Sequence, residues 1–420
     1  MMRYVARAAL SHFIILLRWI VLSCIVGLLV GAVSVGFHYG VEAATELRMS
    51  HPWMLWFLPV GGIVIVLLYK ACGIEEDRGT NLVLVAVREN EPMALRTAPL
   101  IILSTIITHL FGGSSGREGA VLQIGASIAS RLGRRVKLSE HTCRILVVCG
   151  MSAAFSALFG TPITAAIFAM EVVHVGVIHY SAIVPSLLSA LVGLQVAQWF
   201  QVAPAAFAVS GVPVLEPLSL VKIIGMGILF AILSILFYQT MHLSAHLYQK
   251  YMKKPFLRAA AGGGLVILVT LLSGSYDYNG VGMGVIKAAV SGTARPEAFA
   301  FKILLTALTL GAGFKGGEII PAFFAGATFG CVAGPFLGLP ASFSAALGMV
   351  SVFCGVTNCP ITSIILAYEL FGGAGLPFFA LSCAVSYMLS GYGGLYSEQK
   401  IVYSKLKPVP REEQERSLAS

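Results

Sequence analysis

Runs of apolar residues, separated by short polar or glycine-rich breaks, follow one another along almost the whole chain. Several runs reach the length of about 20 residues that spans a bilayer as a helix, while others have only about 12–16 residues and are too short to cross upright. We therefore expect an all-α integral membrane protein with several broken or tilted helices. The pattern predicts apolar helices over the ranges 13–37, 53–72, 98–111, 119–132, 143–171, 181–200, 219–241, 258–273, 299–313, 319–338, 341–354, 360–371 and 374–390.

The most informative break is the stretch FGGSSGREGA at residues 111–120. Its small residues, Gly112 to Gly116, disfavour a helix interior, so the next helix is predicted to begin near Glu118. A helix start carries unpaired N–H groups and about half a positive charge. At membrane depth such irregular backbone survives only where it is buried or lines a cavity, so the stretch predicts an anion site. The Glu118 carboxylate can fill that site itself and leave it on protonation, as a gate would.

Two segments of the chain repeat each other. Residues 150–171 and 348–369 are identical at nine of 22 positions at a constant offset of 198. Broken apolar segments at corresponding positions in two halves indicate a transporter built from inverted repeats. We expect one transmembrane transport domain over residues 1–420, with repeat one at about 13–200, repeat two at about 217–400 and a short polar tail, 405–420.

Composition excludes the soluble classes. Of 420 residues 57% are hydrophobic and only 11% charged, against about 25% charged in soluble domains. The net charge of +9 forms no basic face of the kind that binds nucleic acid. The eight cysteines show no metal-binding spacing, so we expect no metal and no cofactor.

Basic residues gather near the start of the chain, at 250–258 and after residue 400. The positive-inside tendency places all three regions, and thus both termini, in the cytoplasm. The basic residues at 250–258 could mark the join between the two repeats. If each inverted repeat crosses the membrane an odd number of times, however, that join would lie outside the cell. Either an extra crossing lies between the repeats or the charge rule misleads here.

Ionisable residues at membrane depth are costly and each needs a reason. Glu118 and Glu318 both follow glycine-rich breaks and precede apolar helices, so both are candidates for gating or proton handling. The structural alternative for each is a helix cap, and Glu318 has a possible ion pair with Lys315 as well. Glu171 and Glu369 are equivalent within the repeat, which favours a structural role as helix-end contacts.

The remaining polar candidates are weaker. Arg117 and Arg144 are expected to anchor backbone or partner carboxylates, and His109 to be structural. Tyr396 lies in a glycine-broken stretch, from which its hydroxyl can donate to an anion, although an interfacial tyrosine fits equally. Thr80 and Asn81 follow Gly79 and either line the anion path or cap a helix.

Several motifs in order along the chain resemble the CLC family of anion channels and anion/proton antiporters. They are Gly116-Arg117-Glu118-Gly119 with Gln123-Ile124-Gly125, Tyr278-Asn279-Gly280, Gly316-Gly317 to Pro321, and Leu395-Tyr396-Ser397. The resemblance implies a homodimer with a separate pore in each subunit, a CLC-type fold of two inverted repeats and a central anion pathway. It implies that Glu118 is the gating glutamate and Tyr396 the pore tyrosine. It also places Gly116, Arg117, Gly119, Gly317, Ile319 and Ile320 along the anion pathway.

Three departures separate this chain from the chloride-type members. Thr80-Asn81 replaces the serine of their Gly-Ser-Gly-Ile-Pro motif, Glu318 replaces an apolar or basic residue, and Val172 replaces the internal proton-transfer glutamate. These changes resemble the bacterial fluoride-exporting clade. The resemblance implies a fluoride/proton antiporter, not an enzyme, in the bacterial inner membrane, with Glu318 as a second proton-handling carboxylate and chloride at most a weak substrate.

Fluoride is small and strongly hydrated, so a site that binds it needs compact hydrogen-bond donors. Backbone N–H groups and the side chains of Thr and Asn are donors of this kind. Three alternatives remain at this point: a CLC chloride channel or chloride/proton exchanger, an intramembrane protease using Ser114 or Ser127 with His109, and a cation transporter. Glu318 and the lost serine motif favour fluoride over chloride. Positive helix ends argue against cations.

Overall fold

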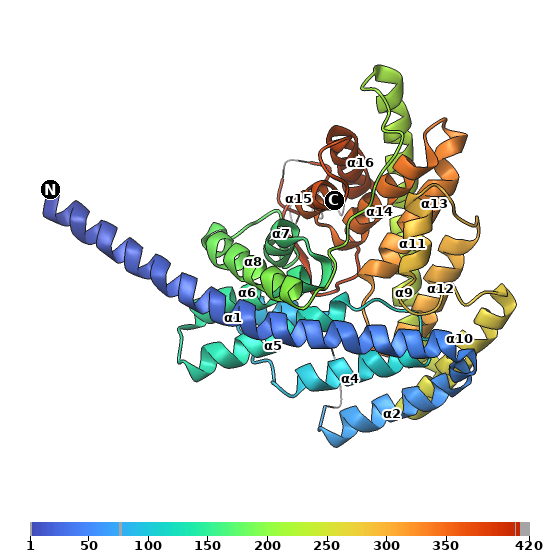
Figure 1. Ribbon diagram of the computed structural model, residues 1–420, viewed down its shortest axis with the longest axis horizontal. Helices are drawn as coiled ribbons and strands as arrows, with labels where there is room; N and C mark the ends of the chain where they lie inside the picture. Colours follow the sequence, from blue (N-terminus) through green and yellow to red (C-terminus); the bar gives the residue numbers. More distant parts are fainter. Residues whose placement is uncertain (1, 75–77, 408, 412–420) are drawn as a thin grey trace, which may run out of the picture.

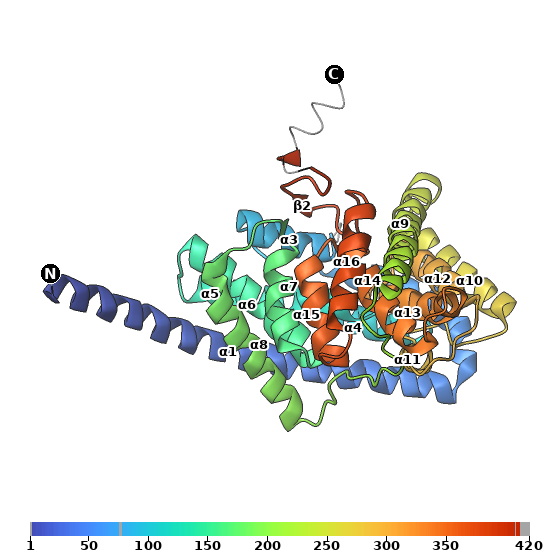
Figure 2. The same ribbon diagram turned by 90° about the horizontal axis from the view of Figure 1, so that it is seen from above.

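The computed structural model describes residues 2–74, 78–407 and 409–411, and this part of the chain is almost entirely helical. Within it, sixteen α-helices divide into two consecutive sets of eight, which lie beside each other in Figure 1. The first half of α1 projects from the body of the molecule (Figures 1 and 2). Repeat one contains α1 (Met2–Ser50), α2 (Leu58–Ala71), α3 (Thr80–Glu89), α4 (Thr97–Leu110), α5 (Glu118–Arg135), α6 (Glu140–Phe159), α7 (Pro162–Glu171) and α8 (Ile183–Trp199).

Repeat two follows the same order of long, short and broken helices. Its long first helix, α9, corresponds to α1, and its last helix, α16, packs on α9 as α8 packs on α1. The short connecting elements are η1 (Pro52–Phe57), β1 (His174–Val175), η2 (Tyr180–Ala182) and β2 (Lys400–Ile401). The helices of repeat two are α9 (Pro217–Tyr251), α10 (Pro255–Ser273), α11 (Met283–Val290), α12 (Ala298–Gly311), α13 (Ile319–Phe336), α14 (Ala341–Thr357), α15 (Pro360–Phe371) and α16 (Leu376–Leu389).

This order accounts for the position of the basic loop. The loop at 250–258 follows α9, the first helix of repeat two, and is not the join between the repeats. The join is the segment 200–216, which contains no Lys or Arg. One helix of repeat two, α9, therefore lies between the join and the basic loop, so basic loops on one side of the membrane are compatible with inverted repeats.

The helix prediction was wrong in three respects. The run 143–171 is two helices, because Gly160 takes a left-handed conformation (φ 74°) after α6 and Pro162 begins α7. The short helices α3 and α11 were missed, since each is too short to give a long apolar run. Both α1 and α9 extend beyond their predicted apolar ranges.

Glycines allow the central helices to cross closely, and they do so in the same way in each repeat. A Cβ atom at Gly125 in α5 would collide with the carbonyl of Gly150 in α6. Gly326 in α13 and Gly348 in α14 repeat this arrangement. Such close approach is available only to residues without a side chain, so it depends on these glycines.

The two repeats also cap each other's helices. The Glu171 carboxylate accepts hydrogen bonds from the N–H groups of Ile361 (3.1 Å) and Thr362 (2.8 Å) at the start of α15. In return, the Glu369 carboxylate accepts from Ile163 (2.9 Å) and Thr164 (2.8 Å) at the start of α7. The structural role predicted for this pair as helix-end contacts is confirmed.

The segment after α16 folds back onto repeat one. Its strand β2 pairs in parallel with β1, and Arg88 of α3 contacts Glu398 at 3.1 Å. In Figure 2 this segment and α3 lie at one face of the molecule, and α11 lies at the opposite face. Residues 412–420 of the predicted tail, and the charged run 75–77, lie outside the described residues.

Seven helical segments of the described chain are long and apolar enough to cross a membrane, namely those at 10–50, 52–71, 140–159, 180–199, 217–251, 255–273 and 319–336. Six further apolar helices of the described chain are shorter, as the sequence predicted, namely those at 97–110, 162–171, 298–311, 341–357, 360–371 and 376–389. Large apolar side chains such as Val221, Ile232 and Leu268 are exposed on the surface. A bilayer would cover such a surface.

Candidate anion site

The two glycine-rich breaks meet at the centre of the molecule. The N–H group of Gly116 donates to the carbonyl of Gly317 at 2.7 Å, and the N–H group of Gly317 donates to the carbonyl of Gly116 at 2.8 Å. Helix α5 begins at Glu118 and α13 begins at Ile319, immediately after this bridge. The N-termini of two helices from different repeats therefore converge on one point.

The Glu118 side chain occupies this point. It is completely buried, and its Oε1 atom accepts a hydrogen bond from the Arg117 N–H group at 3.1 Å. Its other oxygen, Oε2, is buried and has no hydrogen-bond partner among the described residues. A carboxylate thus stands where the partial positive charges of two helix starts would hold a free anion.

Glycine is needed on both sides of this carboxylate. A Cβ atom at Gly116 or at Gly317 would overlap the Glu118 carboxylate oxygens. The Cβ position of Gly317 would also lie 2.8 Å from the backbone nitrogens of Glu118 and Gly119, which shows how closely the helix start approaches. The pocket is therefore compact and lined by backbone.

Two further candidates lie beside Glu118. Glu318 is the N-cap residue of α13, and it is close enough to Glu118 for the two carboxylates to interact electrostatically. Tyr396 is buried and interacts electrostatically with both glutamates. Glu118, Glu318 and Tyr396, which belong to three separate segments, are thus linked by electrostatic interactions. Ile319 and Ile320 form the buried first turn of α13 behind them.

Thr80 and Asn81 lie at the start of α3, next to the same region. The Thr80 hydroxyl oxygen would lie 3.1 Å from a Cβ atom at Gly119, so it faces the start of α5. Asn81 Oδ1 accepts a hydrogen bond from the Glu398 N–H group at 3.2 Å and ties α3 to the segment that carries Tyr396. Neither side chain caps α3, whose N-cap is Gly79.

Arg117 points away from the anion site. One of its guanidinium nitrogens lies 2.7 Å from Nδ1 of His38 in α1. Because Arg only donates, Nδ1 must accept, and the ring proton is on Nε2, which lies 3.4 Å from the Glu42 carboxylate. The expectation that Arg117 anchors backbone or a carboxylate directly was wrong, because a histidine stands between it and Glu42.

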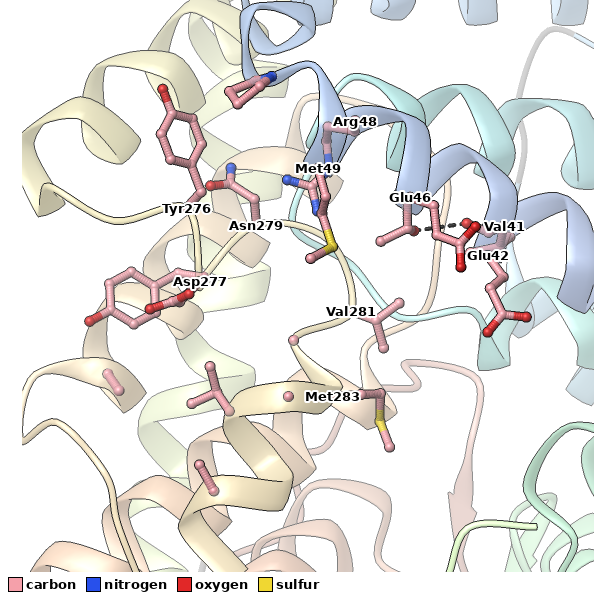
Figure 3. Close-up of a pocket in the computed structure, with 18 of the residues that line it drawn as sticks. Val41, Glu42, Glu46, Arg48, Met49, Tyr276, Asp277, Asn279, Val281 and Met283 are labelled. Atoms are coloured by element: carbon pink, nitrogen blue, oxygen red, sulfur yellow. Dashed lines mark hydrogen bonds between the residues drawn. The ribbon is translucent and has the colours of Figure 1, made fainter. Parts of the chain in front are cut away.

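Arg117 and His38 line a cavity of about 910 Å³ between the end of α1 and the loop before α11. Figure 3 shows Arg48 and Met49 of α1 facing Asn279 and Val281 across this cavity. The cavity reaches the Arg117 side of the anion site and lies at the face of the molecule that carries α11.

A buried lysine supports this cavity from behind and was missed at the level of sequence. Lys302 in α12 is completely buried, and its ammonium group donates to the carbonyls of Gly280 (2.6 Å) and Tyr278 (3.2 Å). Those residues belong to the Tyr-Asn-Gly motif. A lysine inside the predicted apolar helix 299–313 was the signal that could have revealed it.

The residues of the protease alternative have other partners. Ser127 donates to the Gln123 carbonyl at 2.6 Å, and Ser114 donates to the Tyr278 carbonyl at 2.8 Å. The two ring nitrogens of His109 face the carbonyls of Thr105 and Ser115. The serine–histidine pair that this alternative requires is not formed. No group of three potential metal ligands occurs in the part of the chain that was described.

A membrane-embedded helical fold whose two inverted halves direct helix N-termini at one buried point is the architecture of an anion transporter. The profile of the voltage gated chloride channel family matches residues 61–391. The chain belongs to this family, the CLC proteins, and is a multi-pass membrane protein.

One curated relative and two solved structures are similar to this chain over almost its whole length. A chloride/fluoride channel protein of Pseudomonas syringae pv. tomato is 34% identical over 403 residues, which cover 94% of this chain and 89% of the relative. The crystal structure of a CLC-type fluoride/proton antiporter matches with a TM-score of 0.89 at 34% identity, over 92% of this chain and 98% of the other. The crystal structure of a slow cyanobacterial Cl⁻/H⁺ antiporter, at 18% identity, shares the fold with a TM-score of 0.77. The match covers 96% of this chain and 98% of the other.

Proposed function

We propose that this protein is an antiporter that exports fluoride from the cytoplasm in exchange for protons. The observation that carries the proposal is the Glu118 carboxylate between the starts of α5 and α13, with Glu318 beside it. Two relatives at 34% identity whose names include fluoride support the choice of anion.

Glu118 acts as both gate and proton carrier. As a carboxylate it neutralises the helix starts and blocks the anion position. When a proton binds, the side chain loses its charge and its attraction to the N–H groups, so it leaves and fluoride enters. Loss of the proton returns the carboxylate and displaces the fluoride. Anion and proton thus occupy the site alternately, which couples their opposite movements.

Glu318 serves as the second proton-handling carboxylate. The position of the internal proton-transfer glutamate of chloride/proton exchangers is held here by Val172, which is buried and cannot titrate. The neighbouring Glu171 is engaged in capping α15. Glu318 is the carboxylate that interacts with Glu118, which supports a proton exchange between these two residues.

Fluoride selectivity follows from compact donors. The anion position is lined by backbone N–H groups and approached by the Thr80 hydroxyl, with glycines on both sides. A small, strongly hydrated anion needs short hydrogen bonds from several such donors to replace its water. The Tyr396 hydroxyl adds a neutral donor, while the Asn81 oxygen holds the Tyr396 segment in place.

The orientation follows the basic loops. With the N-terminus, the 250–258 loop and the C-terminal segment in the cytoplasm, the cavity of His38 and Arg117 opens outward. Protons then reach Glu118 from that cavity and fluoride leaves through it. The relatives support a bacterial inner membrane as the location. A homodimer, with one pathway in each subunit, completes the proposal and would cover exposed apolar residues such as Ile163 and Ile361.

The test uses purified protein in liposomes loaded with fluoride or with chloride, under a potential clamp, with anion efflux and internal pH recorded together. We expect fluoride efflux with opposed proton uptake and little chloride efflux. Fluoride efflux without proton movement would make the protein a fluoride channel with Glu118 as a plug. Rapid chloride efflux would contradict the fluoride proposal and return the chain to the chloride-transporting members.

A further inference from the structure

A second, smaller cavity of about 120 Å³, whose lining shares no residue with the anion site, lies between the end of α3, the start of α6 and the turn that joins β1 to η2. It is at the face that carries α3 and the C-terminal segment (Figure 2). Five basic or imidazole side chains line it, namely Arg88, His141, Arg144, His174 and His179.

No carboxylate lines this cavity in the described part of the chain, so its charge is not neutralised from within. Arg88 is held in place from outside by Glu89 (2.8 Å) and Glu398 (3.1 Å). The Nε atom of Arg144 is buried and has no hydrogen-bond partner. A buried guanidinium donor without an acceptor is costly, which indicates that an acceptor from another molecule completes it.

The imidazole of His174 is partly buried beside other basic groups. Burial, together with the neighbouring His179, Arg88 and Lys400, lowers the pKa of His174. These groups come from α3, from the turn after β1 and from β2, so the positive field reaches the cavity from several elements. An anion bound there would relieve it.

The floor of the cavity is apolar. It consists of Val148 of α6 and of Ala169, Met170 and Val173 at the end of α7. Tyr180, just beyond the cavity, is exposed as tyrosines at a membrane interface are. Cationic walls above an apolar floor, at the cytoplasmic face of a membrane protein, suit a phosphate with acyl chains better than an ion with a complete water shell.

We propose that this cavity binds a phosphate group, carried by an anionic phospholipid of the inner leaflet or free in the cytoplasm. The guanidinium group of Arg144 is the phosphate ligand, since Arg binds phosphate oxygens in pairs of parallel hydrogen bonds. All three guanidinium nitrogens of Arg88 already donate to Glu89 or Glu398, so Arg88 contributes to the wall without binding the phosphate directly. The site is separate from Glu118 and Glu318. The proposal does not depend on which anion is transported.

The experiment measures lipid retention by native mass spectrometry, and thermal stability, on the purified full-length protein in detergent. The probes are phosphatidylglycerol, phosphatidylcholine and inorganic phosphate. The variants are Arg144→Gln and His179→Gln, both in the wall of the cavity. Because His179 is exposed, its substitution is expected to leave folding intact. Arg135→Gln, at an exposed arginine at the end of α5, is the matched control.

We expect phosphatidylglycerol to be retained and to raise the melting temperature, and each wall variant to weaken its binding about tenfold or more. Arg135→Gln should bind as the wild type does. Stabilisation by inorganic phosphate alone, lost in the wall variants, would assign the site to the free ion. Equal retention of phosphatidylcholine, or unchanged binding in both wall variants, would overturn the proposal, whatever the transport assay shows.

Discussion

At the scale of single residues, the central question is why a carboxylate is buried at the start of two helices. Glu118 compensates for positive ends that otherwise require an anion, so it competes directly with the transported ion. The same side chain can exist in two charge states, and only one of them fits the helix starts. In the proposed mechanism a gate and a proton carrier are thus combined in one group.

We predict that Glu118→Gln abolishes proton coupling, because the amide stays neutral and cannot carry a proton. Fluoride should still cross the membrane in proteoliposomes, with no change of internal pH beyond the leak. The control is Glu140→Gln, at an exposed glutamate at the start of α6, which should retain coupled exchange. Fluoride-driven proton movement in Glu118→Gln would disprove the assignment.

Substitution of Glu318 should affect transport differently. Since this carboxylate lies beside Glu118 at the start of α13, Glu318→Ala removes the second negative charge from the anion site. We predict slower fluoride exchange, by about tenfold or more, or a relaxed exclusion of chloride. Efflux of the two anions is measured side by side. Unchanged fluoride turnover together with unchanged chloride exclusion would remove Glu318 from the mechanism.

At this scale the sequence was informative where a residue type was unusual for its surroundings. Glutamates after glycine-rich breaks stood out at positions 118 and 318, and both lie at helix starts in the structure. The partner of Arg117 could not be predicted, because His38 is 79 residues earlier and only packing of α1 brings it near. Side-chain partners across helices are set by tertiary contacts.

At the scale of elements, the reciprocal caps of α7 and α15 hold the two repeats together. Each carboxylate accepts two backbone hydrogen bonds from the other repeat's helix. These bonds explain why glutamates at equivalent positions end both helices. They also give Glu171 a structural role, although it directly precedes Val172.

We predict that Glu171→Ala and Glu369→Ala each lower the stability by about 1–3 kcal/mol, the cost of charge-assisted caps at helix starts. The melting temperature of the purified protein measures this loss. The number of protons exchanged per fluoride should not change in the surviving protein. A loss of coupling in Glu171→Ala alone, at unchanged stability, would show instead that this residue carries protons.

The C-terminal segment is fastened by Lys405. Its ammonium group donates to Asn358 (2.5 Å) and Ser390 (3.2 Å) near the ends of α14 and α16. Burial lowers the pKa of Lys405 from 10.5 to about 8. Below pH 8 the lysine is protonated in both the folded and the unfolded state. Between pH 8 and 10.5 only the unfolded state keeps the proton, so folding becomes more favourable as the pH rises.

We therefore predict that the wild type gains stability relative to Lys405→Met between pH 8 and 10.5, by a few kcal/mol at most. Thermal melting of both proteins over this range provides the measurement. Lys407→Met, at an exposed neighbouring lysine, is the matched control and should follow the wild type. Parallel pH profiles for the wild type and Lys405→Met would show that burial does not perturb this lysine.

At the scale of the whole molecule, the two repeats meet at the anion site through the bridge between Gly116 and Gly317. The charge distribution orients the molecule around this point. The 250–258 loop and the C-terminal segment belong to one face, while the cavity before α11 belongs to the other.

We predict that cysteines at Lys253 and Lys400 react with an impermeant thiol reagent only from the cytoplasmic side of the membrane. A cysteine at Asp277, in the wall of the larger cavity, should react from outside. The background carries serine at Cys24 and Cys72, the two cysteines that are only partly buried. Labelling of all three positions from one side would contradict the inverted arrangement.

The sequence by itself determined the class of fold, the repeat, and the two helix starts with their glutamates. Apolar periodicity, glycine breaks and ionisable residues at membrane depth are local properties, and local physics constrains them strongly. Only the tertiary structure decided that the two breaks hydrogen-bond to each other and that Glu171 and Glu369 exchange caps. It also decided that His38 holds Arg117 and that Lys302 supports the Tyr-Asn-Gly loop. Those contacts join residues distant in the chain, whose proximity results from helix packing and leaves no mark in the local pattern of residues.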